Sequence, residues 1–204
     1  MLVVTAVAAE AEAVRAGADP AHVVVEPVGV GPAAAAAGTA RLLATGEYRA
    51  VISAGIAGGF AGRAPVGATV IGARSISADL GAESPDGFLP IEELGFGTSR
   101  VTAHPELIKA LTTALPDAIV GDVLTLSTVT GTAETAASLA ARFPRAVAEA
   151  MEGFGVAVAA AGLPFAELRT ISNPIGPRDR AAWRLKEAFA ALSTASTALW
   201  TTCG

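Results

Sequence analysis

Two carboxylates stand in settings where a carboxylate could act on a bound substrate. Glu10 follows the first apolar run of the chain, and Glu152 lies in the very apolar stretch AEAMEGFGVAVAAAG. Removing a carboxylate from water is costly unless a partner compensates, so Glu152 is the strongest single site candidate on physical grounds. General acid–base catalysis is the chemistry that such carboxylates commonly supply. Glu10 has a second interpretation, as a first-turn acid that complements a helix dipole.

Two further segments lie beyond the ends of predicted strands, where α/β proteins commonly bind ligands. The glycine-rich segment Gly55–Gly59 lacks both the GxGxxG spacing and a following Lys-Ser/Thr, so neither a dinucleotide site nor a Walker-type phosphate site is indicated. A tight strand-to-helix turn explains these glycines equally well. Asn173 follows the last long strand, and its Asn-Pro pair has a simple turn as the more common explanation.

The elements that must position these residues alternate between apolar runs of strand length and helical patterns. This alternation indicates an α/β fold with a mixed, largely parallel central sheet flanked by helices. No repeat or low-complexity linker divides the chain. The expected strands are Leu2–Ala8, His22–Val28, Ala50–Ala54, Ala68–Ala73, Ala118–Leu126, Ala146–Met151 and Phe165–Ser172, and the expected helices begin near Glu10 and cover Ala33–Ala44, Pro105–Leu115, Glu134–Arg142, Gly153–Ala161 and Arg180–Leu199.

The composition excludes several classes of protein. The 204 residues are 52% hydrophobic and 16% charged, which is typical of one folded domain over residues 1–204 and not of a disordered chain. The uncharged stretches Pro27–Ala40 and Gly153–Ala166 contain Gly or Pro and are shorter than the roughly 18 residues of a membrane span. A net charge of −5 with two lysines provides no basic stripe for nucleic acid. We expect neither a membrane nor a nucleic-acid partner.

A cytoplasmic location without a metal cofactor is a further expectation. The N-terminus is apolar, lacks a basic leader and reaches Glu10 quickly, unlike a signal peptide. Cys203 is the single cysteine, so no intramolecular disulfide can form. His22 and His104 are isolated from each other, which gives poor support for a metal site. Two function classes remain: an enzyme that acts on a small molecule, and a module that binds one. Neither implies a cofactor.

Four segments resemble successive blocks of the purine nucleoside phosphorylase and nucleosidase superfamily. They are VGVGPAAAAAGTARLL, VISAGIAGGFAGRAPVGATVI, RFPRAVAEAMEGFGVA and LRTISNPIGPRDRAAW, and they occur in the expected order over most of the chain. The resemblance implies an α/β three-layer sandwich of the nucleoside phosphorylase type. Within the superfamily, the opening TAVAAE and the segment ISNPIGPRDRAAW are most similar to the futalosine hydrolases of menaquinone biosynthesis, which are relatives of methylthioadenosine/S-adenosylhomocysteine nucleosidase.

The resemblance implies roles for particular residues. Glu10 fits the A-x-x-x-E position of the family's water-activating glutamate, with Glu12 as the alternative. Met151 and Glu152 match the family's Met-Glu pair, in which the carboxylate bonds the ribose hydroxyls and the methionine packs on the sugar. The other substrate-binding residues expected are Ala57, Gly58, Thr130 and Gly131, of which Ala57 and Gly58 would lie beside the ribose and the water.

One departure from the adenine-specific nucleosidases bears on the base. Those enzymes have Ser-Asp where this chain has Ser172-Asn173. An aspartic acid can protonate purine N7 and accept from a 6-amino group, whereas an asparagine amide donates to a 6-oxo group while still bonding N7. The swap favours a 6-oxopurine such as hypoxanthine, the base of futalosine. It leaves three options for the leaving base: protonation by Asp179, protonation by water, or departure as an anion.

The choice between water and phosphate as the nucleophile depends on basic residues. Phosphorolysis needs an anion site beside the sugar, normally built from arginines and backbone amides. The bacterial phosphorylases have an arginine two residues before the strand-end glycine, and Ser53 occupies that position here. Arg49 and Arg74 match no motif. Water is therefore the expected nucleophile.

The segment GPRDR is the candidate for binding the far end of futalosine, which carries a benzoate. Arg178 or Arg180 would pair with that carboxylate. An exposed loop, or a cap formed with Asp179, is an equally good explanation of both arginines. A homodimer or higher homo-oligomer is implied by the resemblance alone.

The segment Asp79–Arg100 is rich in Gly, Pro and acidic residues and is expected to be a long loop. Such loops are often lids or binding loops. Phe88 and Phe96 are candidates for stacking on the base or the benzoate, with burial in the core as the other interpretation.

The function that the resemblance implies is hydrolysis of futalosine to hypoxanthine and dehypoxanthine futalosine. The alternatives are another purine nucleosidase, a nucleoside phosphorylase, and an inactive nucleoside-binding module. The retention of Glu10, Met151 and Glu152 weighs against an inactive module, because a binder needs no water-activating carboxylate.

Overall fold

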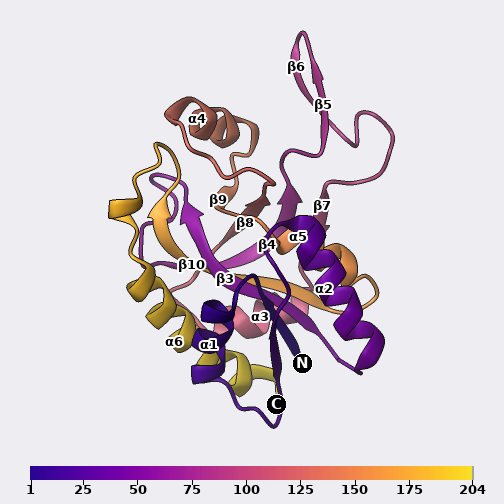
Figure 1. The fold of residues 1–204 in the computed structure, drawn as a ribbon, viewed down its shortest axis with the longest axis vertical. Coiled ribbons are helices and arrows are strands. Elements are labelled where there is room, and N and C mark those ends of the chain that lie inside the picture. Colours follow the sequence, from indigo (N-terminus) through magenta and orange to yellow (C-terminus); the bar gives the residue numbers. More distant parts are fainter. Residues whose placement is uncertain (204) are drawn as a thin grey trace.

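An eight-stranded mixed sheet forms the centre of the computed structural model, which describes residues 1–203 and their side chains as far as residue 198 (Figure 1). The strand order is β10-β4-β8-β9-β3-β1-β2, and β7 pairs with β4. The strands of this sheet are β1 (Leu2–Thr5), β2 (Val24–Pro27), β3 (Val51–Gly59), β4 (Thr69–Ser77), β7 (Arg100–Thr102), β8 (Ile119–Thr125), β9 (Ala146–Ala150) and β10 (Phe165–Pro174).

Most strand pairs are parallel, as the sequence pattern predicts. The pairs β1–β2, β1–β3, β3–β10, β4–β8 and β8–β9 are parallel, whereas β3–β9, β4–β10 and β4–β7 are antiparallel. The expectation of a three-layer sandwich with a largely parallel sheet is confirmed in part, since the sheet does not stay a plain layer. Because β10 pairs with β3 as well as with β4, the strands β3, β10, β4, β8 and β9 close into a barrel-like ring. Central strands with buried residues on both faces favour such closure, since it leaves fewer open edges.

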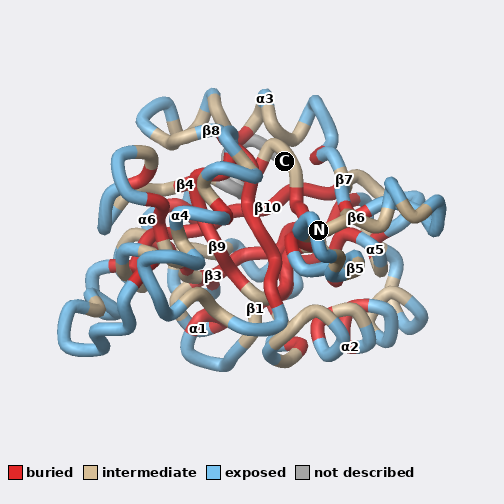
Figure 2. Tube along the Cα trace, turned by 90° about the horizontal axis from the view of Figure 1, so that it is seen from above, coloured by how far each residue is buried: buried red, intermediate tan, exposed pale blue. Residues whose placement is uncertain are grey.

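Helices cover the sheet from both sides. Helices α1, α3 and α6 share one apolar cluster, in which Ala11, Leu111 and Leu192 pack with Ile52 and Leu168 of the sheet. Helices α2 and α5 pack on the other side. The tube in Figure 2 shows buried strands inside and helices whose outer turns are exposed. The helices are α1 (Ala8–Gly17), α2 (Pro32–Thr45), α3 (Pro105–Ala114), α4 (Ala133–Arg142), α5 (Gly153–Ala159) and α6 (Leu185–Cys203), with a 3-10 turn at Arg180–Ala182.

Three expectations about local structure need correction. The glycine segment 55–59 continues strand β3 and is not a turn. The expected loop Asp79–Arg100 contains a hairpin of β5 (Gly81–Ser84) and β6 (Gly87–Pro90), which projects from the body of the molecule in Figure 1. The closing helix begins at Leu185 because Asp179 instead caps a separate 3-10 turn through a bond to Ala181 N.

Membrane-spanning helices, clusters of metal-binding side chains and the single cysteine were each considered in the sequence. In the described part of the chain, no helix is long and apolar enough to cross a membrane. Among the same residues, no three His, Cys, Asp or Glu side chains gather as a possible metal site. The side chain of Cys203 lies outside the described residues.

Candidate active site

A cavity of about 340 Å³ lies at the carboxyl ends of β1, β3, β9 and β10. This volume falls within the range of small-molecule sites, roughly 300–1,000 Å³. Gly131, one of the expected substrate-binding residues, is not in the lining, and its carbonyl oxygen accepts a hydrogen bond from Arg178 N at 3.3 Å. The expected residues that line the cavity are Glu10, Ala57, Gly58, Thr130, Met151, Glu152, Asn173, Arg178 and Asp179.

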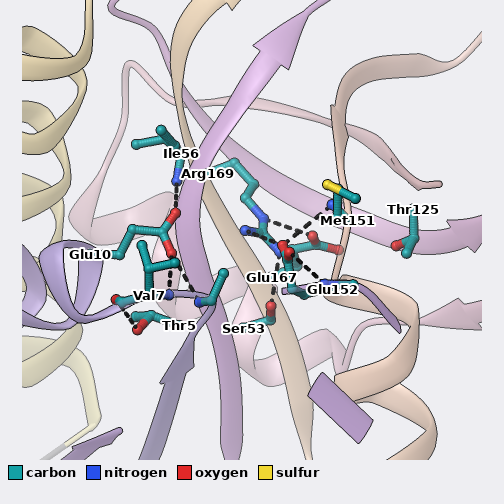
Figure 3. Close-up of polar contacts among 12 residues, drawn as sticks. Thr5, Val7, Glu10, Ser53, Ile56, Thr125, Met151, Glu152, Glu167 and Arg169 are labelled. Carbon is teal, nitrogen blue, oxygen red and sulfur yellow. Dashed lines mark hydrogen bonds and ion pairs between the residues drawn. The ribbon is translucent and has the colours of Figure 1, made fainter. Parts of the chain in front are cut away.

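Glu10 is held at the cavity by backbone amides from two different segments. Its Oε2 accepts hydrogen bonds from Ala6 N at 2.9 Å and Val7 N at 3.3 Å, and its Oε1 accepts one from Ile56 N at 2.9 Å (Figure 3). Glu10 lies in the first turn of α1, so its position also suits the helix dipole. Burial raises the pKa of Glu10 above its ordinary 4.5, although Arg169 and the bond from Ile56 oppose this. A buried carboxylate with a raised pKa is suited to accept a proton from water.

Glu152 follows β9 and precedes α5, where it faces the same cavity. Its Oε1 accepts from Gly31 N at 3.2 Å, and its Oε2 accepts from Met151 N at 3.3 Å. The residue is only 6% exposed. The partner that a buried Glu152 requires is Arg169, whose Nη1 lies 3.6 Å from Glu152 Oε2.

Arg169 is a buried guanidinium beneath both carboxylates, and it does not line the cavity itself (Figure 3). Its Nε donates to Glu167 Oε1 at 2.9 Å, and its Nη2 donates to Ser53 Oγ at 3.0 Å. These bonds fix the guanidinium plane, so Nη1 is directed at Glu152. Arg169 is therefore a positioning residue for the cavity carboxylates.

The charges of this cluster do not cancel. Glu10, Glu152 and Glu167 surround one guanidinium, and the hydroxyl of Ser75 donates to Glu167 Oε2. Burial raises the pKa of Glu167, while Arg169 and Ser75 oppose the increase. Burial outweighs the attraction to the single guanidinium at Glu10 and Glu167, so these two carboxylates have raised pKa values and hold a proton more readily than exposed glutamates do.

Gly55 explains how these groups can lie so close to strand β3. A Cβ atom at this position would stand 2.5 Å from Glu10 Oε1 and 2.8 Å from Arg169 Nη1. Real Cβ atoms do not approach other atoms so closely, so only glycine leaves room for both side chains. The glycine that the sequence pattern assigns to a turn therefore serves the site from within a strand.

Asn173 is oriented by an irregularity in β10. The register of β10 against β3 shifts between Ile171 and Asn173, which marks a bulge at Ser172. Ser172 Oγ donates to Asn173 Oδ1 at 2.8 Å, so the oxygen of the amide is the atom that faces the serine. Bulges commonly redirect a side chain beside a binding site. The amide nitrogen, which donates to Pro174 O at 3.0 Å, keeps a second N–H for a ligand.

A third carboxylate, Glu149, lines the cavity near Thr130. Its Oε1 accepts from Thr130 N at 2.7 Å and its Oε2 from Thr130 Oγ at 2.5 Å. Burial raises the pKa of Glu149, and both bonds from Thr130 lower it. The loop after β8 is thereby tied to β9.

The GPRDR segment forms one wall of the cavity with Trp183. The guanidinium of Arg178 lies over the Trp183 ring, 5.6 Å from its centroid. Arg178 and Asp179 are exposed residues that line the cavity, whereas Arg180 is absent from the lining. Arg178 is the one cationic side chain among the described residues of the lining.

Several sequence candidates lie elsewhere. Glu12 is exposed on α1 and outside the lining. Phe96 is 79% exposed, and Phe88 stacks against Arg142 at 4.0 Å from its ring centroid. No residue of the segment 79–100 is among the described residues that line the cavity, so Phe88 and Phe96 lie outside the lining.

Sequence reasoning overlooked Arg169, Glu167, Glu149 and Trp183. The first three are charged residues inside runs that the pattern assigns to buried strands. The desolvation argument that selected Glu152 applies equally to them, and it would have identified them. Trp183 carried no comparable signal, because aromatic residues beside a helix start are usually packing residues.

Comparisons with known proteins show which family the chain belongs to. The model of the phosphorylase superfamily matches residues 8–203. A futalosine hydrolase of Streptomyces coelicolor is 57% identical over 174 residues, covering 82% of this chain and 74% of the relative. A futalosine hydrolase of Acidothermus cellulolyticus is 48% identical over 221 residues, covering 95% of this chain and 90% of the relative.

The solved structures agree on the fold. The futalosine hydrolase of Helicobacter pylori superposes with a TM-score of 0.84 at 14% identity, covering 98% of this chain and 96% of the other. The resemblance inferred from the four sequence blocks is confirmed. The chain belongs to the phosphorylase superfamily and, within it, to the futalosine hydrolase family.

Proposed function

We propose that the chain is a nucleosidase that hydrolyses futalosine to hypoxanthine and dehypoxanthine futalosine, a step of menaquinone biosynthesis. The observation that carries the proposal is the convergence of Glu10 and Glu152 on one cavity that Asn173 also lines. Membership in the futalosine hydrolase family supplies the substrate.

Glu10 is the general base in this proposal. Water attacks the anomeric carbon of the ribose and passes a proton to Glu10, while the bond between that carbon and N9 breaks. The electron pair of the broken bond goes to the base, which takes a proton from Asp179 or from solvent, or leaves as an anion. The raised pKa of Glu10 brings its basicity closer to neutral pH, where a general base is most effective.

Glu152 binds the ribose and stabilises the positive charge that develops at the anomeric carbon. N-glycoside hydrolysis passes through an oxocarbenium-like transition state, by analogy with O-glycoside chemistry. A carboxylate held by two backbone amides and facing Arg169 needs little reorganisation during the reaction. Met151 lines the cavity beside it and packs on the sugar.

Asn173 binds the departing base. Because Ser172 donates to the amide oxygen, the amide N–H is available to the 6-oxo group or N7 of hypoxanthine. At the far end of the substrate, Arg178 pairs with the benzoate carboxylate, since it is the one cation among the described lining residues.

Phosphorolysis has little support in the geometry. Arg74 is engaged by Asp122, with its Nε donating to Oδ1 at 2.9 Å, and Arg49 is exposed and outside the cavity lining. Neither arginine could therefore hold a phosphate beside the ribose without rearrangement. Water activated by Glu10 is the nucleophile that the site favours.

Turnover of three nucleosides tests the proposal. The purified protein is incubated with futalosine, inosine and methylthioadenosine, each with and without phosphate, and free base is quantified by chromatography. We expect hypoxanthine from futalosine at a rate that phosphate does not change. Preferred release of adenine from methylthioadenosine, or a strict phosphate requirement, would contradict the proposal.

Glu152→Gln should reduce kcat/KM for futalosine by about 10²–10³-fold, since it removes a preorganised charge from the transition state. The fold should be retained with a small decrease in stability, because Gly31 N and Met151 N bond different oxygens of Glu152 and the single glutamine oxygen can still accept one of these bonds. Steady-state kinetics and circular dichroism measure both. Glu106→Gln, in the first turn of α3 outside the cavity, is the matched control. Similar rates for the two variants would remove Glu152 from the mechanism.

Three expectations from the sequence stay proposals. They are that residues 1–204 form a single domain, that the protein is cytoplasmic, and that it assembles as a homodimer or higher homo-oligomer. The family resemblance supports the last, and sedimentation analysis would measure the number of protomers.

A further inference from the structure

Glu149 is a buried carboxylate that the proposed reaction does not use. It lies in β9, is 6% exposed and lines the same cavity as Asn173. A hydrogen bond to Thr130 alone could be made by a neutral side chain without the cost of burying a charge. An ionised carboxylate offers about four acceptor positions, and the two bonds from Thr130 occupy only part of them. The remaining acceptor capacity is available to a ligand in the cavity.

The strand register places Glu149 and Asn173 on either side of Gly58. Gly58 pairs with Glu149 on β9 and with Asn173 on β10, so the three residues lie in one row across neighbouring strands. Neighbouring strands are roughly 4.8 Å apart, which puts the outer two backbones about 10 Å apart. Gly58 places no side chain of its own between them, although the side chain of Ile175 approaches it, since a Cβ at Gly58 would lie 2.9 Å from Ile175 Cγ1. An acceptor and a donor on the two strands that flank Gly58 thus line the same cavity.

The polar edge of hypoxanthine matches this pair. It presents N1–H as a donor and O6 and N7 as acceptors, whereas adenine presents N1 as an acceptor and its 6-amino group as a donor. Asn173 has a free amide N–H for O6 or N7. A carboxylate opposite complements N1–H and repels the N1 lone pair of adenine.

We infer that Glu149 accepts the N1–H of a 6-oxopurine and, together with Asn173, selects hypoxanthine over adenine. The inference rests on the proposed function, because it assigns a base-recognition residue to the same site. Glu149 would thereby add a second selective contact, at N1, to the one expected from Asn173 at O6 or N7.

Binding of free bases tests the inference without relying on catalysis. Hypoxanthine, 1-methylhypoxanthine and adenine are titrated by calorimetry into the wild-type protein, Glu149→Gln and Glu149→Ala. A charge-assisted hydrogen bond contributes roughly 10- to 100-fold in affinity, so both variants should bind hypoxanthine weaker by that factor. Binding of 1-methylhypoxanthine, which has no N1–H, should change little. Equal losses for all three bases would overturn the inference, because they would show that Glu149 only holds the loop after β8.

A matched control separates recognition from loop positioning. Thr130→Val removes the hydroxyl that bonds Glu149 Oε2 but retains the carboxylate and a β-branched side chain. The ratio of hypoxanthine to adenine affinity should stay at the wild-type value in this variant and fall in Glu149→Gln. The same fall in both variants would overturn the inference. Thermal unfolding of each variant verifies that the compared proteins are folded.

Kinetics distinguish failure of this inference from failure of the proposed function. If the wild type releases no hypoxanthine from futalosine, the proposed function is wrong, whatever the bases show. If it does, kcat/KM is compared for futalosine and its 6-amino analogue. Glu149→Gln should narrow the ratio of the two values by roughly 10- to 100-fold. An unchanged ratio would contradict the role of Glu149 while leaving the hydrolase activity established.

Discussion

Glu10→Gln is expected to lower kcat for futalosine by about 10²–10⁴-fold, the usual contribution of a general base. Three backbone amides donate to Glu10, and between them they use both carboxylate oxygens. A glutamine has only one side-chain oxygen, so some of these hydrogen bonds would be lost. The loss should therefore appear mainly in kcat, with a small decrease in stability. Single-turnover release of hypoxanthine measures the chemical step directly.

The pH dependence of the wild type provides an independent readout for Glu10. The base must be ionised, and burial raises its pKa above 4.5, so kcat/KM should decline as the pH falls through that raised value. The acid limb should be lost in Glu10→Gln. Glu12→Gln is the control, because Glu12 is exposed on the same helix and outside the cavity. If Glu12→Gln and not Glu10→Gln abolished turnover, the assignment of the base would be reversed.

Arg169→Met is expected to produce the largest loss of stability of any single change discussed for this protein. It leaves Glu152 and Glu167 buried without the cation that faces both. Removing one partner of a buried ion pair costs about 3–5 kcal/mol, a large share of the roughly 5–15 kcal/mol that stabilises a typical domain. Denaturant unfolding at several pH values measures the change in free energy.

The sign of the pH effect in this variant follows from proton linkage. Burial raises the pKa values of Glu10 and Glu167 and Arg169 opposes this, so without Arg169 both pKa values rise further above those of the unfolded state and the folded state binds more protons. The contribution of these groups to the free energy of unfolding is then fully present at acid pH and is lost as the pH rises. The free energy of unfolding of Arg169→Met should therefore fall less below the wild-type value near pH 5 than near pH 8.

Two further variants make the Arg169 prediction specific. Arg184→Gln removes the exposed ion pair with Glu187, whose atoms are 2.9 Å apart, and should cost at most about 1 kcal/mol. Adding Glu167→Gln to Arg169→Met should recover part of the stability, since it removes one unpaired charge. If Arg169→Met lowered the free energy of unfolding no more than Arg184→Gln does, the buried cluster would not contribute the stability assigned to it.

Local sequence patterns were sufficient for most elements of the sheet but not for its closure. The apolar runs Leu2–Ala8 and Phe165–Ser172 predict strands, which the structure has at Leu2–Thr5 and Phe165–Pro174, because continuous burial on both faces leaves few other options. The pairing of β10 with both β3 and β4 has no local signature, because it joins residues 95 to 115 positions apart in the chain. The glycines of segment 55–59 were misassigned for a related reason. The close neighbours of Gly55, Glu10 and Arg169, are distant in sequence, so a turn was the nearest local explanation.

By itself, the sequence determined the family, the α/β class and the identity of Glu10, Glu152 and Asn173 as candidate site residues, because each of these depends on residue types in a local context. Only the tertiary structure decided that they share one cavity. Strand β9 runs antiparallel to β3, and in a flat sheet their carboxyl ends would lie at opposite edges. The two strands pair only at Gly58–Glu149 and Gly59–Ala148, near the carboxyl end of each. Ring closure brings those ends together, and with them Glu149, Glu152 and Asn173, which line one cavity with Glu10.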